Sequence, residues 1–218
     1  MIKIEVWSDI NCPFCYIGKR NLEKALKKFP NANLVDVEWK SFELDPYTIP
    51  PKGADNTERL ANKYGKDRAW AEQMNLEMTK NARSVGLDFH MDKVIPANSF
   101  DAHRILHLAK LHGVQDQLKE KLLSLKFIEG LDISDHKVLK EAALNLGLDN
   151  EEVQTVLESE KFGQDVRRDE DQAGALGIRG VPFFIFNKER SISGAQPVAS
   201  FLAMLEDSAN FKVYSNLE

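Results

Sequence analysis

Cysteine is scarce in this chain, since Cys12 and Cys15 are the only two among 218 residues. This scarcity excludes a fold stapled by several disulfide bonds, as in many small secreted domains. It also argues against a structural zinc site, because zinc usually takes a second Cys or Cys/His pair at ligand spacing and the sequence has none. The two cysteines therefore form one close pair, separated by two residues.

Other absences narrow the class of protein. There is no basic block and the formal net charge is −5, which argues against nucleic acid as the main partner. No apolar run approaches the roughly 20 residues needed to span a bilayer, so we expect no membrane segment. We expect no secretory signal, because the sequence enters a strand-like stretch at once, without a basic region followed by an apolar one. Because a lone cysteine pair suits a reducing compartment, we predict a cytoplasmic protein.

The cysteine pair lies between a predicted strand and a predicted helix. Residues 2–7 alternate apolar and charged side chains, and from Pro13 onward apolar residues recur at helical spacing. A thiol at a helix N-terminus meets unpaired N–H groups and a positive dipole end, which favour thiolate. A free thiol of pKa 8.5 is only about 3% ionised at pH 7, whereas in such motifs the pKa falls to roughly 3.5–7.5.

Two intervening residues place the cysteines about one helical turn apart. Cys15 is then able to attack a mixed disulfide formed at Cys12. The alternative is a pair of buried structural thiols. The motif and its place at a strand-to-helix corner favour redox chemistry.

The rest of the pattern predicts an interrupted domain. Residues 34–42 form a second strand, residues 46–56 break the pattern with prolines and glycine, and about a hundred mostly helical residues follow. A helix, two short strands and a final helix from Gln196 complete the chain. We predict an α/β protein with a thioredoxin-like domain in residues 1–52 and 160–218, and a large all-helical insertion in residues 53–159.

Several motifs together resemble the DsbA family, beginning with Cys12-Pro13-Phe14-Cys15 and Gly180-Val181-Pro182 on either side of a helical insertion. More narrowly, the chain is similar to the FrnE-like branch of cytoplasmic thiol–disulfide oxidoreductases. The stretches that carry this likeness are Ser8-Asp9, Cys12 to Arg20, Phe42 to Pro46, Phe100 to Arg104, Glu129-Gly130 and Ile192 to Pro197. The kappa-class glutathione transferases and 2-hydroxychromene-2-carboxylate isomerases share this architecture, but typically replace the attacking cysteine by serine.

The resemblance implies roles for residues at the motif. Cys12 would be the exposed attacking thiol and Cys15 the buried resolving thiol, with Pro13 and Phe14 contacting substrate or tuning the redox potential. It also implies a cis peptide between Val181 and Pro182, facing the motif and leaving the Val181 backbone free to pair with a substrate chain. From the residues alone, a trans proline at a strand start is the commoner case.

Three further residues are candidates for the cleft. Asp9 stands three residues before the motif, and Asn98 and His103 match positions that face the cleft in kappa-type relatives. The ordinary alternatives are that Asp9 is simply solvated, and that Asn98 and His103 cap a helix or lie on its surface. His103 and His107 have a spacing that could bind metal, but no HExxH glutamate accompanies them, so we expect no metal.

The predicted function is a cytoplasmic thiol–disulfide oxidoreductase or isomerase that uses the Cys12–Cys15 couple on protein or small-molecule disulfides. No cofactor is expected beyond that redox-active disulfide, with glutathione left open as a co-substrate. The alternatives are a glutathione-dependent isomerase or transferase and a binding module with a structural dithiol. The sequence leaves open the substrate and the redox direction. It also leaves open a homodimer, since the apolar stripes of the insertion could contact a second subunit or form the core of the insertion itself.

Overall fold

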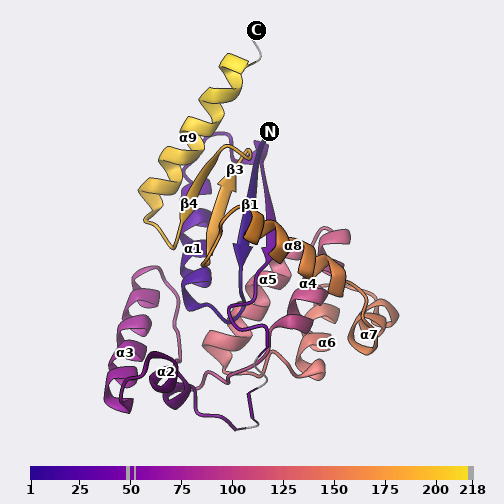
Figure 1. The fold of residues 1–218 in the computed structure, drawn as a ribbon. Helices are drawn as coiled ribbons and strands as arrows, with labels where there is room; N and C mark the ends of the chain where they lie inside the picture. Colours follow the sequence, from indigo (N-terminus) through magenta and orange to yellow (C-terminus); the bar gives the residue numbers. More distant parts are fainter. Residues whose placement is uncertain (48–49, 52, 216–218) are drawn as a thin grey trace.

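The computed structural model describes residues 1–47, 50–51 and 53–215. Figure 1 follows the chain through these elements. The first part contains β1 (Ile2–Ser8), α1 (Pro13–Leu26), a 3₁₀ turn (Ala32–Leu34) and β2 (Val35–Ser41). The middle contains α2 (Asn56–Tyr64), α3 (Arg68–Ser84), α4 (Phe100–Leu111), α5 (Gln115–Ser124), a π-helical turn (Leu125–Glu129), α6 (His136–Leu144) and α7 (Asn150–Glu158). The last part contains α8 (Gly163–Ala175), β3 (Phe183–Phe186), β4 (Arg190–Ser193) and α9 (Val198–Ser215).

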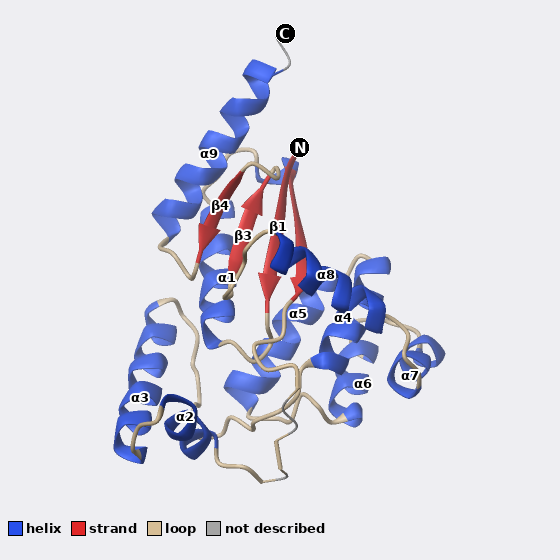
Figure 2. Cartoon of the chain, in the orientation of Figure 1, coloured by secondary structure: helices blue, strands red, loops and turns tan. Residues whose placement is uncertain are grey.

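The four strands form one mixed sheet in the order β2-β1-β3-β4 (Figure 2). β1 runs parallel to β2 and antiparallel to β3, which pairs antiparallel with β4. In the described part of the chain, only helical elements lie between β2 and β3. The prediction of an α/β, thioredoxin-like fold with a large helical insertion is confirmed.

Alternation in β1 separates the two faces of the sheet. Ile2, Ile4 and Val6 are buried with residues of α1 and α9 on one face. Trp7 points to the other face, where it packs beside α8 and its Nε1 donates to the Asp169 carbonyl at 2.9 Å. The period-two pattern of the sequence thus produces two covered faces, which hold the carboxyl end of β1 and the following loop in place.

The insertion packs around the loop that follows β1. Ile10, Tyr16 and Ile17 belong to the same buried cluster as residues of α3 to α7. Tyr16 stacks on Phe89 with ring centroids 5.7 Å apart, and Phe89 stacks on Phe127 at 5.0 Å. The start of α1 is therefore buried between the two parts of the chain. The boundaries at residues 52/53 and 159/160 stay a prediction.

Some helix ends differ from expectation. α1 ends at Leu26, and α2 was not foreseen as a separate helix of the insertion. Ser99 is the N-cap of α4, and Asn98, one residue before it, accepts the Phe100 N–H at 2.8 Å. Asp101 pairs with Arg104 at 2.7 Å. Among the described residues, no helix combines the length and apolar character needed to cross a membrane.

Gly18 generates a prediction about packing. A Cβ at this position in α1 would lie 2.9 Å from Pro182 Cγ and 3.2 Å from Phe184 Cζ. Because a proline ring cannot swing aside, we expect Gly18→Ala to lower the free energy of unfolding by about 1–3 kcal/mol, measured by urea denaturation.

Gly174→Ala in α8 is the matched control. Nothing lies within 4 Å of its added Cβ, so the usual helix preference for alanine should raise stability by up to about 1 kcal/mol. Equal stabilities for the two variants would contradict the close packing at Gly18.

Candidate active site

Cys12 is the residue at which α1 begins. It adopts an extended backbone conformation (φ −98°, ψ 111°) as the N-cap, with Pro13 in the first turn. The Cys12 N–H donates to the Asp9 carbonyl at 3.2 Å, and the Cys15 N–H donates to the Cys12 carbonyl at 3.0 Å. Within the described residues the Cys12 side chain forms no capping bond, and both cysteines are free thiols. The sulfur of Cys12 is therefore positioned by the backbone.

Burial distinguishes the two thiols less than the resemblance implies. Cys15 is fully buried, as expected, but Cys12 is also only 4% exposed. The expectation of an exposed Cys12 is thus wrong: Cys12 lies in the wall of a cavity, and its sulfur lies 3.5 Å from the Val181 carbonyl oxygen.

The proline loop faces Cys12. The Val181–Pro182 peptide bond is cis, which confirms the expectation from the resemblance. Cys12 Sγ lies 3.5 Å from the Val181 carbonyl oxygen, although 169 positions separate the two residues in the chain. The Gly194 N–H donates to the Pro182 carbonyl at 2.8 Å and ties the loop to the end of β4. The fold therefore brings the two predicted halves of the site together.

The two thiols share one stabilised negative charge. Burial of Cys15 opposes ionisation, but the thiol of Cys12 and the ammonium of Lys119 lower the pKa of Cys15. The hydrogen bond to Cys15, together with burial, raises the pKa of Cys12 well above its ordinary value. The buried pair thus favours a single ionisation, and Lys119 stabilises the negative charge on the dithiol.

Lys119 is the cation beside this pair. It extends from α5, is completely buried, and donates from Nζ to the Ser8 carbonyl at 3.1 Å. Its Nζ lies 5.7 Å from the centroid of the Trp39 ring. Burial lowers the pKa of Lys119 to about 8, although the negative charges of Cys15 and Asp9 act to raise it. The insertion therefore places a positive charge under the thiols.

Asp9 and His103 lie behind the site rather than in the cleft. Asp9 is fully buried and accepts the Asn11 N–H at 3.0 Å and the Leu44 N–H at 2.8 Å. His103 Nε2 is 3.5 Å from Asp9 Oδ1. Burial opposes the charge of Asp9, but His103 and the two N–H groups lower the pKa of Asp9. Asp9 thus fixes the shape of the loop before Cys12.

Asn98 is also placed elsewhere, just before α4, where its side chain accepts the Phe100 N–H. None of Asp9, Asn98 and His103 is among the described residues that line the cavity, which corrects their expected position. His107 contacts Asp169 at 3.3 Å and the Ser41 hydroxyl at 3.1 Å, so the two histidines have different partners.

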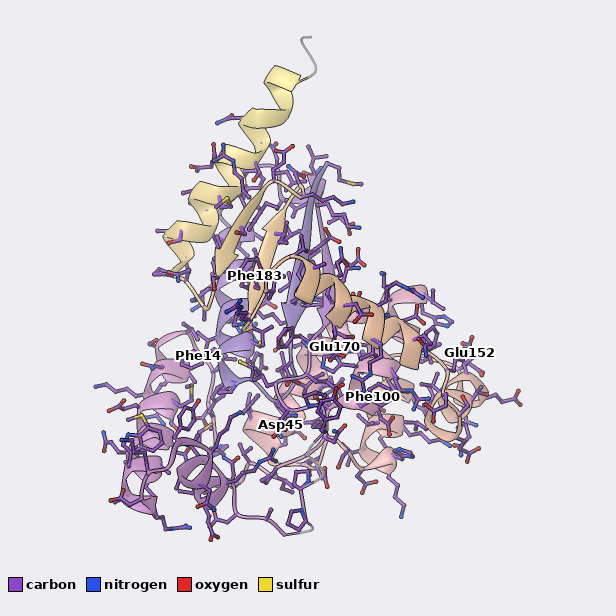
Figure 3. The ribbon with its side chains drawn as sticks, viewed as in Figure 1. Phe14, Asp45, Phe100, Glu152, Glu170 and Phe183 are labelled. Atoms are coloured by element: carbon purple, nitrogen blue, oxygen red, sulfur yellow. The ribbon has the colours of Figure 1, made fainter. Side chains whose placement is uncertain are left out.

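The cavity beside Cys12 has a volume of about 530 Å³. Asn11 to Phe14 line one side, and the α2–α3 hairpin, residues of the 91–97 segment and Lys126 line the others. Figure 3 shows Phe14 at the lower end of α1, on the side that faces α3, and Phe14 is 46% exposed. Much of the lining is apolar, including Leu60, Trp70, Met74, Met78, Met91 and Phe127.

Lys119 and Lys126 were missed from the sequence. Each lies on a helical stretch rich in lysine, where a solvent-exposed role is the default. The feature of the sequence that could have predicted their burial is spacing. Buried Leu122 follows Lys119 by three residues and precedes Lys126 by four. In a regular helix these positions share one face, so two lysines beside a core leucine indicate buried cations.

A dithiol at a helix N-terminus facing a cis-proline loop defines a thiol–disulfide oxidoreductase of the thioredoxin fold, or a related isomerase. The chain belongs to the family of DSBA-like thioredoxin domains, whose model matches residues 3–206. A crystal structure described as a probable DsbA oxidoreductase of Streptomyces coelicolor is 36% identical, with a TM-score of 0.91 over 96% of this chain and 91% of that one. The uncharacterized protein YwbO of Bacillus subtilis is 28% identical over 97% of this chain and 99% of its own length.

More remote structures share the fold. The cytosolic disulfide reductase DsbM of Pseudomonas aeruginosa with GSH has a TM-score of 0.67 at 17% identity, over 95% of this chain and 99% of that one. A 2-hydroxychromene-2-carboxylate isomerase has a TM-score of 0.68 at 15% identity, over 99% and 98% of the two chains. These neighbours agree with the FrnE-like branch inferred from the motifs.

The buried lysine generates a prediction about ionisation. Lys119→Met removes the positive charge beside Cys15, so the pKa at which the dithiol first ionises should rise by about one unit. The pH profile of thiolate ultraviolet absorbance measures this shift, and alkylation at neutral pH should slow accordingly. Lys110→Met is the control, because Lys110 is 43% exposed and pairs with Glu38. Coincident profiles for the wild type and Lys119→Met would show that Lys119 does not act on the thiols.

Proposed function

We propose that this protein is a cytoplasmic thiol–disulfide oxidoreductase or isomerase that works through Cys12 and Cys15. The observation that carries the proposal is the position of Cys12 Sγ, 3.5 Å from the Val181 carbonyl and beside a buried Cys15. The cytoplasmic assignment rests on the lone cysteine pair and on the absence of other cysteines that would staple loops.

The chemistry is a two-step exchange. The Cys12 proton passes to the Cys15 thiolate as Cys12 sulfur attacks a substrate disulfide, which forms a mixed disulfide and releases one substrate thiolate. Cys15 then loses that proton, to the released substrate thiolate or to water, and attacks the Cys12 sulfur. This step releases the second substrate thiolate and leaves a Cys12–Cys15 disulfide. The substrate gains two electrons and the dithiol loses two, and the reverse sequence oxidises a dithiol substrate.

Substrates fall into two classes in this proposal. Disulfide-bearing peptides would pair with the Val181 backbone as strands do at a sheet edge. Small disulfides, glutathione disulfide among them, would enter the cavity, whose volume of about 530 Å³ is typical of small-molecule sites. The DsbM structure with GSH supports glutathione as a co-substrate. A homodimer stays a prediction.

A glutathione-dependent isomerase is the second candidate. The fold likeness to a 2-hydroxychromene-2-carboxylate isomerase favours it. In that case glutathione would bind at the Val181–Pro182 edge and the dithiol would be incidental. The retention of both thiols beside a buried lysine favours disulfide exchange instead.

Cysteine variants test the proposal. Cys15→Ser should accumulate mixed disulfides at Cys12, because the resolving thiol is gone, and non-reducing electrophoresis with mass spectrometry would detect them. Cys12→Ser should reduce disulfide exchange to the uncatalysed rate. Unchanged exchange in Cys12→Ser would refute the proposal, and glutathione-dependent isomerase turnover that survives loss of both cysteines would establish the second candidate.

A further inference from the structure

Lys126 is a buried cation at the cavity that the exchange mechanism does not use. It lies in the π-helical turn after α5, is 2% exposed, and lines the cavity that also contains Cys12. Its Nζ donates to the Ile95 carbonyl at 2.8 Å. An ammonium group carries three N–H donors, so this bond leaves two donors for other groups.

No carboxylate of the described residues lies within ion-pair distance of Lys126. Lys121, five positions earlier on α5, shows the contrast, because it is exposed and pairs with Glu129 at 2.9 Å. Burial lowers the pKa of Lys126 to about 8; the more distant Asp9 and Asp132 act to raise it and Arg59 to lower it. A buried charge without a close counter-ion is unfavourable, so a buried lysine beside a cavity points to an anion supplied by a ligand.

The other charges on the cavity wall agree with this. Arg59, Lys63 and Lys126 are the cations among the described lining residues, and Asp45 and Glu77 are the anions. Arg59 pairs with Asp45. Among these three cations, Lys126 is the one whose side chain is buried. The wall therefore has a net positive charge, although the protein has a net charge of −5.

The rest of the cavity lining favours a ligand with an apolar part. Trp70, Met74 and Met78 line it from α3, and Tyr64 lies against Trp70 with ring centroids 5.5 Å apart. Methionine thioethers are flexible and make favourable contacts with aromatic rings, so such a wall accommodates flat apolar groups of varied shape.

We propose that the cavity binds a small, apolar disulfide that bears a carboxylate, with the carboxylate on Lys126 Nζ and the sulfurs at Cys12. This inference rests on the proposed exchange function and names its substrate class. Cys12 and Cys15 become a disulfide as the bound disulfide takes up two electrons and leaves as two carboxylate-bearing thiols. Lys126 makes no bond to the reacting atoms and acts as a specificity-determining residue.

Two aromatic disulfides separate charge from shape. Dithiobis(nitrobenzoate) carries carboxylates, whereas dithiodipyridine is neutral, and both release coloured thiols when the reduced protein attacks them. Stopped-flow measurement of both gives a ratio of anionic to neutral rate constants for each variant. Lys126→Met should lower this ratio about tenfold or more, as expected for loss of a hydrogen bond to a charged group. Lys126→Arg should retain most of the ratio, because it keeps the charge.

Lys121→Met is the matched control and should leave the ratio unchanged, since Lys121 does not line the cavity. Lys126→Gln is a second variant that removes the charge but keeps a donor for the Ile95 carbonyl, and circular dichroism checks that each variant is folded. An unchanged ratio in folded Lys126→Gln and Lys126→Met would overturn the inference. If Cys12 of the wild type attacks neither disulfide, the proposed exchange function itself fails, which is a different result.

Discussion

The approach of the first turns of α1 to the Val181–Pro182 loop is the contact on which the rest of the site depends. It needs the absence of a side chain at Gly18, where an added Cβ would meet the proline ring. It places Cys12 Sγ beside the Val181 carbonyl, and it requires β3 to lie next to β1 in the sheet. A site divided between residues 12 and 182 therefore depends on the close packing of α1 against Pro182 and Phe184.

The helical insertion contributes electrostatics as well as shape. α5 brings Lys119 beneath the thiols, and the turn after α5 brings Lys126 to the cavity wall. Both lysines are buried, and burial lowers the pKa of each to about 8. The thioredoxin-like part thus supplies the sulfur atoms and the proline loop, while the insertion supplies the charges that act on the thiols and, in our proposal, on the substrate.

Much of the fold could be predicted because its signals are local. Alternation in residues 2–7 defines a strand, and the proline after Cys12 together with helical spacing defines α1. The limits of sequence analysis appear where burial depends on a distant element. Cys12 was expected to be exposed but lies in a cavity bordered by α2 and α3, and α2 itself was not foreseen. The expected positions of Asp9 and His103 were wrong for the same reason, since the two side chains are buried together, with His103 Nε2 3.5 Å from Asp9 Oδ1.

The sequence by itself determined that a CxxC pair lies at a strand-to-helix corner, because that placement depends only on neighbouring residues. It also determined the family, since the motifs that carry the likeness are contiguous stretches. Only the tertiary structure decided which cation stabilises the ionised dithiol, because Lys119, which lowers the pKa of Cys15, lies more than a hundred positions away in the chain. The surroundings of Cys12 were likewise decided by long-range packing, because buried charge and cavity shape arise where separate elements meet.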